Sequence, residues 1–138
     1  MCHVANYELF GVFFPNDIPF PMAAAALSPA SSSRPRWRAR ANLTIGGLID
    51  LVEIREGDAL KTLKVDLPET IDLLLLDGAK SIYTEILRLV ESRLRPGAFI
   101  VADNIDNSPE YAARVRSTEN GYVSLPFRED VELSMRIG

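Results

Sequence analysis

Residues 71–80 read IDLLLLDGAK, and residues 97–104 read GAFIVADN. Each stretch is a short apolar run followed by side chains that carry oxygen: Asp77 in the first, and Asp103 with Asn104 in the second. Runs of this length, bounded by turn residues, are typical of buried strands in a parallel sheet. Their ends then lie at the sheet edge where open α/β folds bind ligands. Oxygen-only ligands suit Mg²⁺, Mn²⁺ or Ca²⁺ better than Zn²⁺.

The bulk composition is that of one ordinary globular domain. The chain has 138 residues, of which 47% are hydrophobic and 25% charged, and its net charge is −4. This charge argues against a surface built mainly for nucleic acid. Cys2 and His3, the single residues of their types, cannot build a disulfide framework or a zinc site, so we expect a cytoplasmic protein. No apolar run is long enough for a membrane span, and prolines interrupt the stretch that resembles a signal peptide.

The chain changes character near residue 40. Residues 1–40 hold five of the nine prolines and carry a net charge of +2, whereas residues 41–138 carry −6. We therefore expect an atypical, partly irregular N-terminal segment over residues 1–40, followed by an α/β half-domain over residues 41–138. Within the first segment, residues 6–14 favour a strand because they are rich in aromatic side chains, and residues 28–33 favour a linker.

The second part alternates between strand and helix patterns, which predicts a mostly parallel sheet that ends in an antiparallel hairpin. Gly46 and Gly47 should end a helix that begins near Arg36, and Asp58 should cap another. The expected helices are 36–45, 58–63, 81–94 and 109–117, and the expected strands are 51–55, 71–76, 98–102, 122–125 and 131–137.

Four blocks stand in order along this part: VEIREGDAL at 52–60, LDGAKSIY at 76–83, LRPGA at 94–98 and VADN at 101–104. Together they resemble the S-adenosylmethionine-dependent O-methyltransferases of the catechol and caffeoyl-CoA type. Any one block alone would be weak, and their order and spacing make the resemblance specific. The resemblance implies part of the Rossmann-like sheet of class I methyltransferases, covering about residues 41–138.

The resemblance also implies roles for particular residues. Asp77, Asp103 and Asn104 match the ligands of a divalent cation, with Mg²⁺ as the expected ion. The cation would favour the ionised form of a substrate hydroxyl. Lys80 matches the general base that removes the hydroxyl proton. Each residue also has an ordinary structural interpretation, because Asp77 can belong to a turn and Lys80 can be a solvated lysine at a helix start.

The implied cofactor is S-adenosylmethionine. Gly57, Asp58 and Ala59 match the stretch that lies against the adenine in relatives, and Asp77 is expected to contribute to the same pocket. Asp58 as a helix cap is compatible with this role. Tyr83, one helical turn beyond Lys80, is more typical of packing than of catalysis.

The cofactor half of the family pattern is missing from residues 1–40. Relatives have a strand with a glycine-rich turn and a second strand that ends in an acidic residue, and neither is present here. These two strands would lie between the strands at 51–55 and 71–76, where residues 6–14 are expected to fill one position and not both. We therefore hypothesise a chain whose N-terminal half was lost or replaced, with impaired methyl transfer.

The acceptor is a small hydroxylated molecule. Pro126 stands where catechol-specific relatives have a glutamate, so a broader class that includes vicinal-diol phenols is expected. The main alternative is a non-catalytic α/β remnant that completes its sheet as a homo-oligomer. A nucleic-acid role for residues 34–40, with Trp37 between arginines, is less favoured than a basic linker. A dinucleotide-dependent dehydrogenase is disfavoured because the glycine fingerprint is absent.

Overall fold

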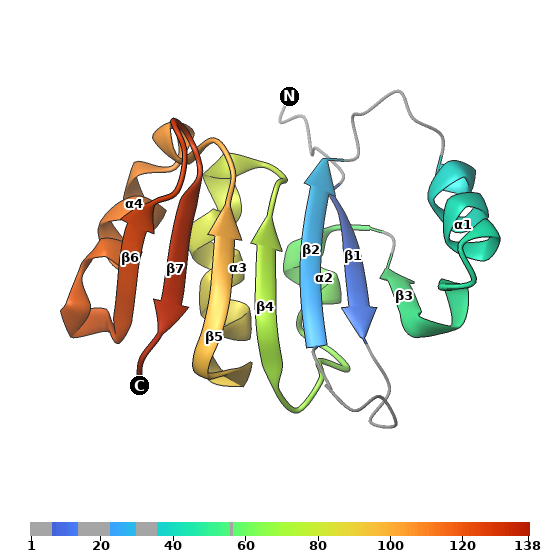
Figure 1. Ribbon diagram of the computed structural model, residues 1–138, viewed down its shortest axis with the longest axis horizontal. Helices are drawn as coiled ribbons and strands as arrows, with labels where there is room; N and C mark the ends of the chain where they lie inside the picture. The colour runs from blue at the N-terminus through green and yellow to red at the C-terminus, as the bar shows by residue number, and fades with distance from the viewer. Residues whose placement is uncertain (1–6, 14–22, 30–35, 56) are drawn as a thin grey trace.

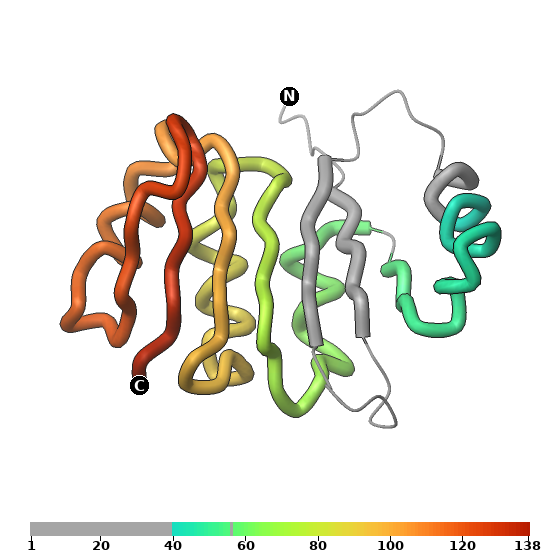
Figure 2. Tube along the Cα trace, viewed as in Figure 1, coloured from blue at the N-terminus to red at the C-terminus, as the bar shows by residue number. Residues whose placement is uncertain are grey.

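A seven-stranded mixed sheet organises the chain (Figure 1). The computed structural model describes the backbone of residues 7–13, 23–29, 36–55 and 57–138, and the side chains of residues 40–55 and 57–138. The strand order is β3-β1-β2-β4-β5-β7-β6, so the C-terminal strands form one side of the sheet, as the tube in Figure 2 shows. The strands are β1 (Tyr7–Phe13), β2 (Ala23–Pro29), β3 (Val52–Arg55), β4 (Ile71–Leu76), β5 (Leu94–Ala102), β6 (Tyr122–Pro126) and β7 (Glu132–Arg136).

The centre of the sheet is parallel, as the two apolar runs predict. β2 pairs with β4 and β4 with β5 in parallel register, and Leu76 lies opposite Ala102 where the last two strands end. β7 runs antiparallel to both β5 and β6, which confirms the expected C-terminal hairpin. The fold is therefore an α/β sheet of Rossmann-like type with parallel and antiparallel strands.

The helices begin and end close to the expected positions, with one correction. They are α1 (Arg36–Ile45), α2 (Ala59–Thr62), α3 (Tyr83–Val90) and α4 (Pro109–Arg116). The helix expected over 81–94 is wrong in its extent, because short 3₁₀ turns flank α3 and Leu94 already pairs with Ile71 in the sheet. Leu94 thus belongs to the strand and not to the helix, and Pro96 keeps Arg95 out of the helical conformation as well.

The two faces of the sheet differ in what covers them. Figure 1 shows α2, α3 and α4 behind the sheet, on the same face. On that face Leu74, Leu76 and Ile100 are fully buried. On the opposite face Leu75 keeps 38% of its surface exposed and Phe99 keeps 45%. In the described part of the chain, the helices thus build a core on one side only.

The N-terminal segment fills both sheet positions between β3 and β4, which corrects the expectation that it fills one. β1 and β2 form an antiparallel hairpin, with β1 beside β3 and β2 beside β4. The strand expected over 6–14 is confirmed as β1, whereas β2 was not expected. The linker expected over 28–33 is wrong at Ser28 and Pro29, which belong to β2, and the rest of it lies outside the described residues. No helix among the described residues is long and apolar enough to span a bilayer.

Candidate functional site

Two carboxylates converge on one ammonium where β4 and β5 end. Lys80 Nζ lies 3.4 Å from Asp77 Oδ1 and 3.7 Å from Asp103 Oδ2. The Lys80 side chain is largely buried, at 18% exposure, while Asp77 is 55% and Asp103 34% exposed. The structure therefore brings together three of the four residues that were predicted for metal binding and proton transfer.

The ends of the two strands are held together by main-chain and side-chain hydrogen bonds. The Asp103 amide donates to the Leu76 carbonyl at 2.9 Å, which continues the ladder beyond the last strand residues. The Tyr83 hydroxyl donates to the same carbonyl at 2.7 Å and lies 3.2 Å from the Asp103 carbonyl. Tyr83 is fully buried, so its packing role is accompanied by a second one: it fixes the backbone from which both carboxylates project.

The charges at this edge are unbalanced toward the negative. Burial and the neighbouring charge of Asp77 raise the pKa of Asp103, while Lys80 acts in the opposite direction. Asp130 adds to the rise. Burial and the charge of Asp77 also raise the pKa of Tyr83, which keeps its hydroxyl protonated as a donor. The pKa of Asp103 is thus raised first by burial and then by negative neighbours that Lys80 does not fully balance.

Asn104 follows Asp103 in a left-handed conformation, with φ 50° and ψ 50°. Asparagine tolerates this region better than most residues. Its Nδ2 donates to Asp130 Oδ2 at 2.9 Å, so the amide presents Oδ1 as its acceptor. The sequence analysis did not predict Asp130. A signal was present in the expected C-terminal hairpin, because the link between its two strands lies at the edge of the sheet where β5 ends.

The residues present fit a divalent cation by two observations. A positively charged atom, Lys80 Nζ, already lies between the two carboxylates, so both side chains point toward one cation-sized position. Asn104 directly follows Asp103, and its Nδ2 bond to Asp130 leaves Oδ1 as a neutral oxygen donor of the kind that Mg²⁺ and Mn²⁺ accept beside carboxylates. Within the described residues, no three His, Cys, Asp or Glu side chains form a metal-binding group by themselves, and the expected set has two carboxylates and one amide.

Apart from Asp77 itself, the residues predicted to contact the cofactor lie at the same edge of the sheet but away from the carboxylates. β1 and β2 separate β3 from β4, which places Gly57 roughly 15 Å from Asp77 along the edge. Gly57 has φ +128°, which favours glycine. Asp58 caps α2 by accepting from the Leu60 amide at 3.0 Å, and Ala59 is fully buried. The cofactor role of these residues stays a prediction.

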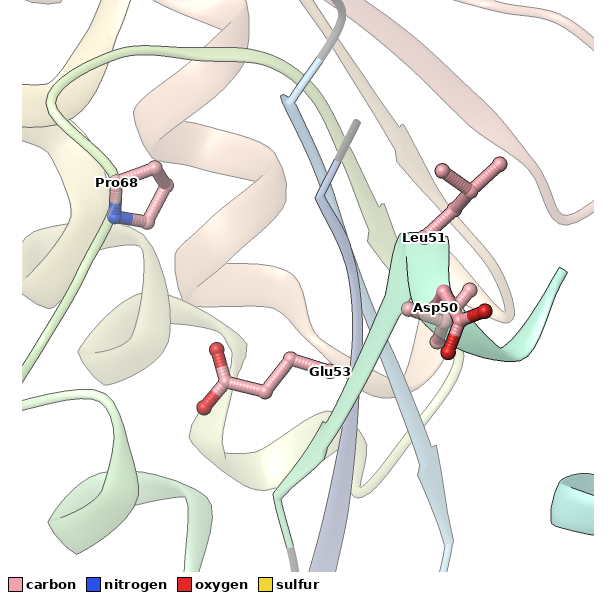
Figure 3. A pocket seen from close by; sticks show the side chains of 5 residues that line it. Asp50, Leu51, Glu53 and Pro68 are labelled. Atoms are coloured by element: carbon pink, nitrogen blue, oxygen red, sulfur yellow. The ribbon is translucent and has the colours of Figure 1, made fainter. Parts of the chain in front are cut away.

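A hollow of about 340 Å³ adjoins the site. Lys80 belongs both to this hollow and to the carboxylate cluster, which makes it the boundary between the two. A second hollow of about 420 Å³ lies where β3, the outermost strand on one side of the sheet, begins. Figure 3 shows Glu53 and Pro68 lining it. The first hollow is lined by Lys80, Ser81, Thr84, Glu85, Asn107, Ser108, Pro109 and Glu110.

Comparison with known proteins identifies the family of the chain. Residues 12–105 match the model of a family described as a methyltransferase domain. This match begins within the segment before residue 41. A search among curated proteins gave no match.

Solved structures share the fold. They include a candidate O-methyltransferase from Klebsiella pneumoniae, with 22% identity and a TM-score of 0.65 over 72% of this chain and 56% of that one. An O-methyltransferase from Bacillus cereus in complex with SAH has 19% identity and a TM-score of 0.63, with the same two shares covered. A candidate caffeoyl-CoA O-methyltransferase from Staphylococcus aureus has 17% identity and a TM-score of 0.62, covering 72% and 58%. The chain thus spans 56–58% of the length of these relatives.

Proposed function

Because this chain belongs to the methyltransferase-domain family, we propose that it takes part in transfer of a methyl group from S-adenosylmethionine to a hydroxyl of a small acceptor. The observation that carries the proposal is the convergence of Asp77 and Asp103 on Lys80 at the carboxyl ends of β4 and β5. Ligands of open α/β sheets bind at this edge. The chain spans little more than half the length of the solved relatives. That this chain catalyses the transfer by itself is therefore a second part of the proposal.

Three side chains would hold the cation that such chemistry uses: Asp77, Asp103 and Asn104. When bound, Mg²⁺ stabilises the ionised form of the acceptor hydroxyl. Lys80, in its neutral form, would take the hydroxyl proton at Nζ. The acceptor oxygen then forms a bond to the methyl carbon as the bond from that carbon to sulfur breaks. Partial burial of Lys80 restricts the position of its amine, which favours a productive geometry.

Cofactor binding would use the same edge of the sheet. Gly57, Asp58 and Ala59 lie beyond the end of β3, and Asp77 lies beyond the end of β4. The roughly 15 Å between them is a span that an extended nucleoside-containing ligand covers. The hollow beside Lys80 is the proposed place for the acceptor, because the proposed base lines it. Its polar lining suits a small hydroxylated molecule.

The test is calorimetric titration of S-adenosylmethionine, followed by an assay of methyl transfer to a vicinal-diol phenol with and without Mg²⁺. We expect cofactor binding by the wild-type chain and metal-dependent transfer that Lys80→Met abolishes. Ser81→Ala, in the same hollow, is the matched control and should keep cofactor binding intact. Absence of cofactor binding to a folded chain would reject catalysis by this chain alone.

The open face of the sheet supports a second candidate: a non-catalytic module that pairs with a second copy of itself. Monomers rarely expose contiguous apolar patches beyond a few hundred Å². Sedimentation of the wild-type chain and of Phe99→Glu distinguishes the two functions, because a dimer without cofactor binding supports the second. The register aligns two rows of apolar side chains on this face: Leu73, Phe99, Met135 and Val123, then Leu75, Val101, Leu133 and Leu125.

A further inference from the structure

The loop between β6 and β7 contacts the candidate metal site through Asp130. This loop closes tightly, because the Phe127 amide donates to the Val131 carbonyl at 2.9 Å. The Asp130 carbonyl accepts from the Ile105 amide at 2.8 Å, and Ile105 is buried. The loop is therefore attached by its main chain to the segment that follows β5. Asp130 is held at a defined distance from Asn104, and the contact between their side chains is not a contact between two mobile surface groups.

The hydrogen bond from Asn104 to Asp130 determines which end of the amide faces the carboxylates. A carboxylate accepts and does not donate, so only the Nδ2 end of Asn104 can face Asp130. Oδ1 then points to the other side, as a ligand of a cation must. Rotation about the last side-chain bond of asparagine has two broad minima of similar energy. Without a partner for Nδ2, the amide would spend part of its time with its nitrogen toward the cation.

We propose that Asp130 is a positioning residue, which orients the Asn104 amide so that Oδ1 serves as the third oxygen ligand of the divalent cation. This inference rests on the proposed function, because it needs a cation at Asp77, Asp103 and Asn104. Outer partners that orient metal ligands commonly change metal affinity by about 10- to 100-fold when they are removed. The proposal gives the β6–β7 loop a definite task, although none of its residues is one of the expected ligands.

Titration of Mn²⁺, followed by calorimetry and by the electron spin resonance of the free ion, tests the proposal without any activity measurement. Asp130→Ala removes the acceptor, and Asp130→Ser moves the side-chain oxygen one bond further from Asn104 Nδ2, so both should weaken Mn²⁺ binding about tenfold. Asp130→Asn can still accept from Nδ2 through its own amide oxygen, so it should stay within about threefold of wild type. Glu129→Gln, in the same loop, removes one negative charge without a contact to Asn104 and should leave the affinity unchanged.

Each other outcome overturns the proposal in a recognisable way. Unchanged affinity in both Asp130→Ala and Asp130→Ser would show that the hydrogen bond does not orient Asn104. Equal losses in Asp130→Asn and Asp130→Ala would show that the charge of Asp130 matters and its hydrogen bond does not. If the wild-type chain binds no Mn²⁺, the proposed metal site itself fails. Circular dichroism of every variant confirms that a loss of affinity is not a loss of fold, and Asp130→Ser provides the second variant if Asp130→Ala unfolds.

Discussion

Carboxylates lie at both ends of the strands of the sheet, and their surroundings shift the carboxyl pKa in opposite directions. At the end where β7 finishes, Glu91 accepts from the Tyr122 hydroxyl at 2.7 Å and from Arg114 Nη2 at 2.8 and 2.9 Å. Arg136 Nη1 lies 3.6 Å away. One carboxylate therefore faces two guanidinium groups and a phenol. Burial raises the pKa of Glu91, but the hydrogen bonds and positive charges outweigh it and leave the pKa below its usual value.

At the end where β4 and β5 finish, two carboxylates share one ammonium. Burial again raises the pKa, here of Asp103, and the neighbouring Asp77 raises it further because Lys80 alone cannot balance both charges. The comparison shows that burial acts in the same direction at both ends, and that the partners decide the outcome. The charge of Glu91 is compensated by the guanidinium groups around it, whereas Asp77 and Asp103 share the single positive charge of Lys80.

The largest expected effect is on metal affinity, and it should be confined to one end. Asp103→Asn removes a charged ligand, so we expect Mn²⁺ binding to weaken at least about 100-fold, equivalent to ~2.7 kcal/mol. Glu91→Gln removes one carboxylate charge at the other end and should leave the affinity unchanged. Calorimetric titration of both variants measures this. Equal effects of the two substitutions would mean that net charge, and not this site, controls metal binding.

The free energy of unfolding should be more sensitive to substitution of Glu91 than to substitution of Asp77, the reverse of the order expected for metal affinity. Glu91→Gln leaves two guanidinium groups and the Tyr122 hydroxyl with a weaker acceptor, and we expect a loss of about 1–3 kcal/mol in the free energy of unfolding. Asp77→Asn relieves repulsion between two partly exposed carboxylates, so metal-free protein should change by less than about 0.5 kcal/mol. Urea unfolding in the presence of a chelator measures both. A larger loss for Asp77→Asn than for Glu91→Gln would contradict the comparison.

The two ends should also differ in how pH affects stability. The pKa of Glu91 lies below its ordinary value of 4.5 in the folded protein, so its contribution is full above that value and is lost as pH falls through the folded pKa. The pKa of Asp103 lies above its ordinary value of 3.8, so its unfavourable contribution at neutral pH is relieved as pH falls through the folded pKa. Glu91→Gln should flatten the acid side of the stability curve, and Asp103→Asn should steepen it. Urea titrations from about pH 3 to 7 show whether the two variants diverge.

The part of the fold built from local patterns could be predicted from the sequence, and the part built from long-range pairing could not. β4 follows its apolar run residue for residue, and Asp58 caps α2 as expected. β2 was not predicted, because its alanines have no strand preference of their own. This strand is formed through its pairing with β1 and β4. The end of α3 was misplaced because the pairing of Leu94 with Ile71 cannot be seen in a helical pattern.

The candidate site divides in the same way. Asp77, Asp103 and Lys80 lie close to strand ends of a parallel pair, so their convergence follows from the topology that the apolar runs predict. Asp130 lies 26 residues from Asn104, and only the pairing of β7 beside β5 brings the two together. A short hairpin link with several acidic residues is a weak signal by itself. The ligands could thus be read from local motifs, whereas the residue proposed to orient one of them required the sheet order.

The smallest expected change in metal affinity is that of Lys80→Met. This substitution separates the two roles of Lys80, as a competitor of the dication and as the proposed general base. Its ammonium occupies a position between Asp77 and Asp103, so it competes with a dication for the same carboxylates. Lys80→Met should therefore raise the Mn²⁺ affinity about threefold, or ~0.6 kcal/mol, a size typical of a partly solvated ion pair. The same substitution should abolish methyl transfer, because no amine remains to accept the proton.

The gain in Mn²⁺ affinity should shrink in high salt, since screening weakens the repulsion that the ammonium exerts. A loss of Mn²⁺ affinity in Lys80→Met would instead mean that Lys80 holds the two carboxylates in place for the metal, and the shortage of positive charge at this end of the sheet would no longer explain how the site works.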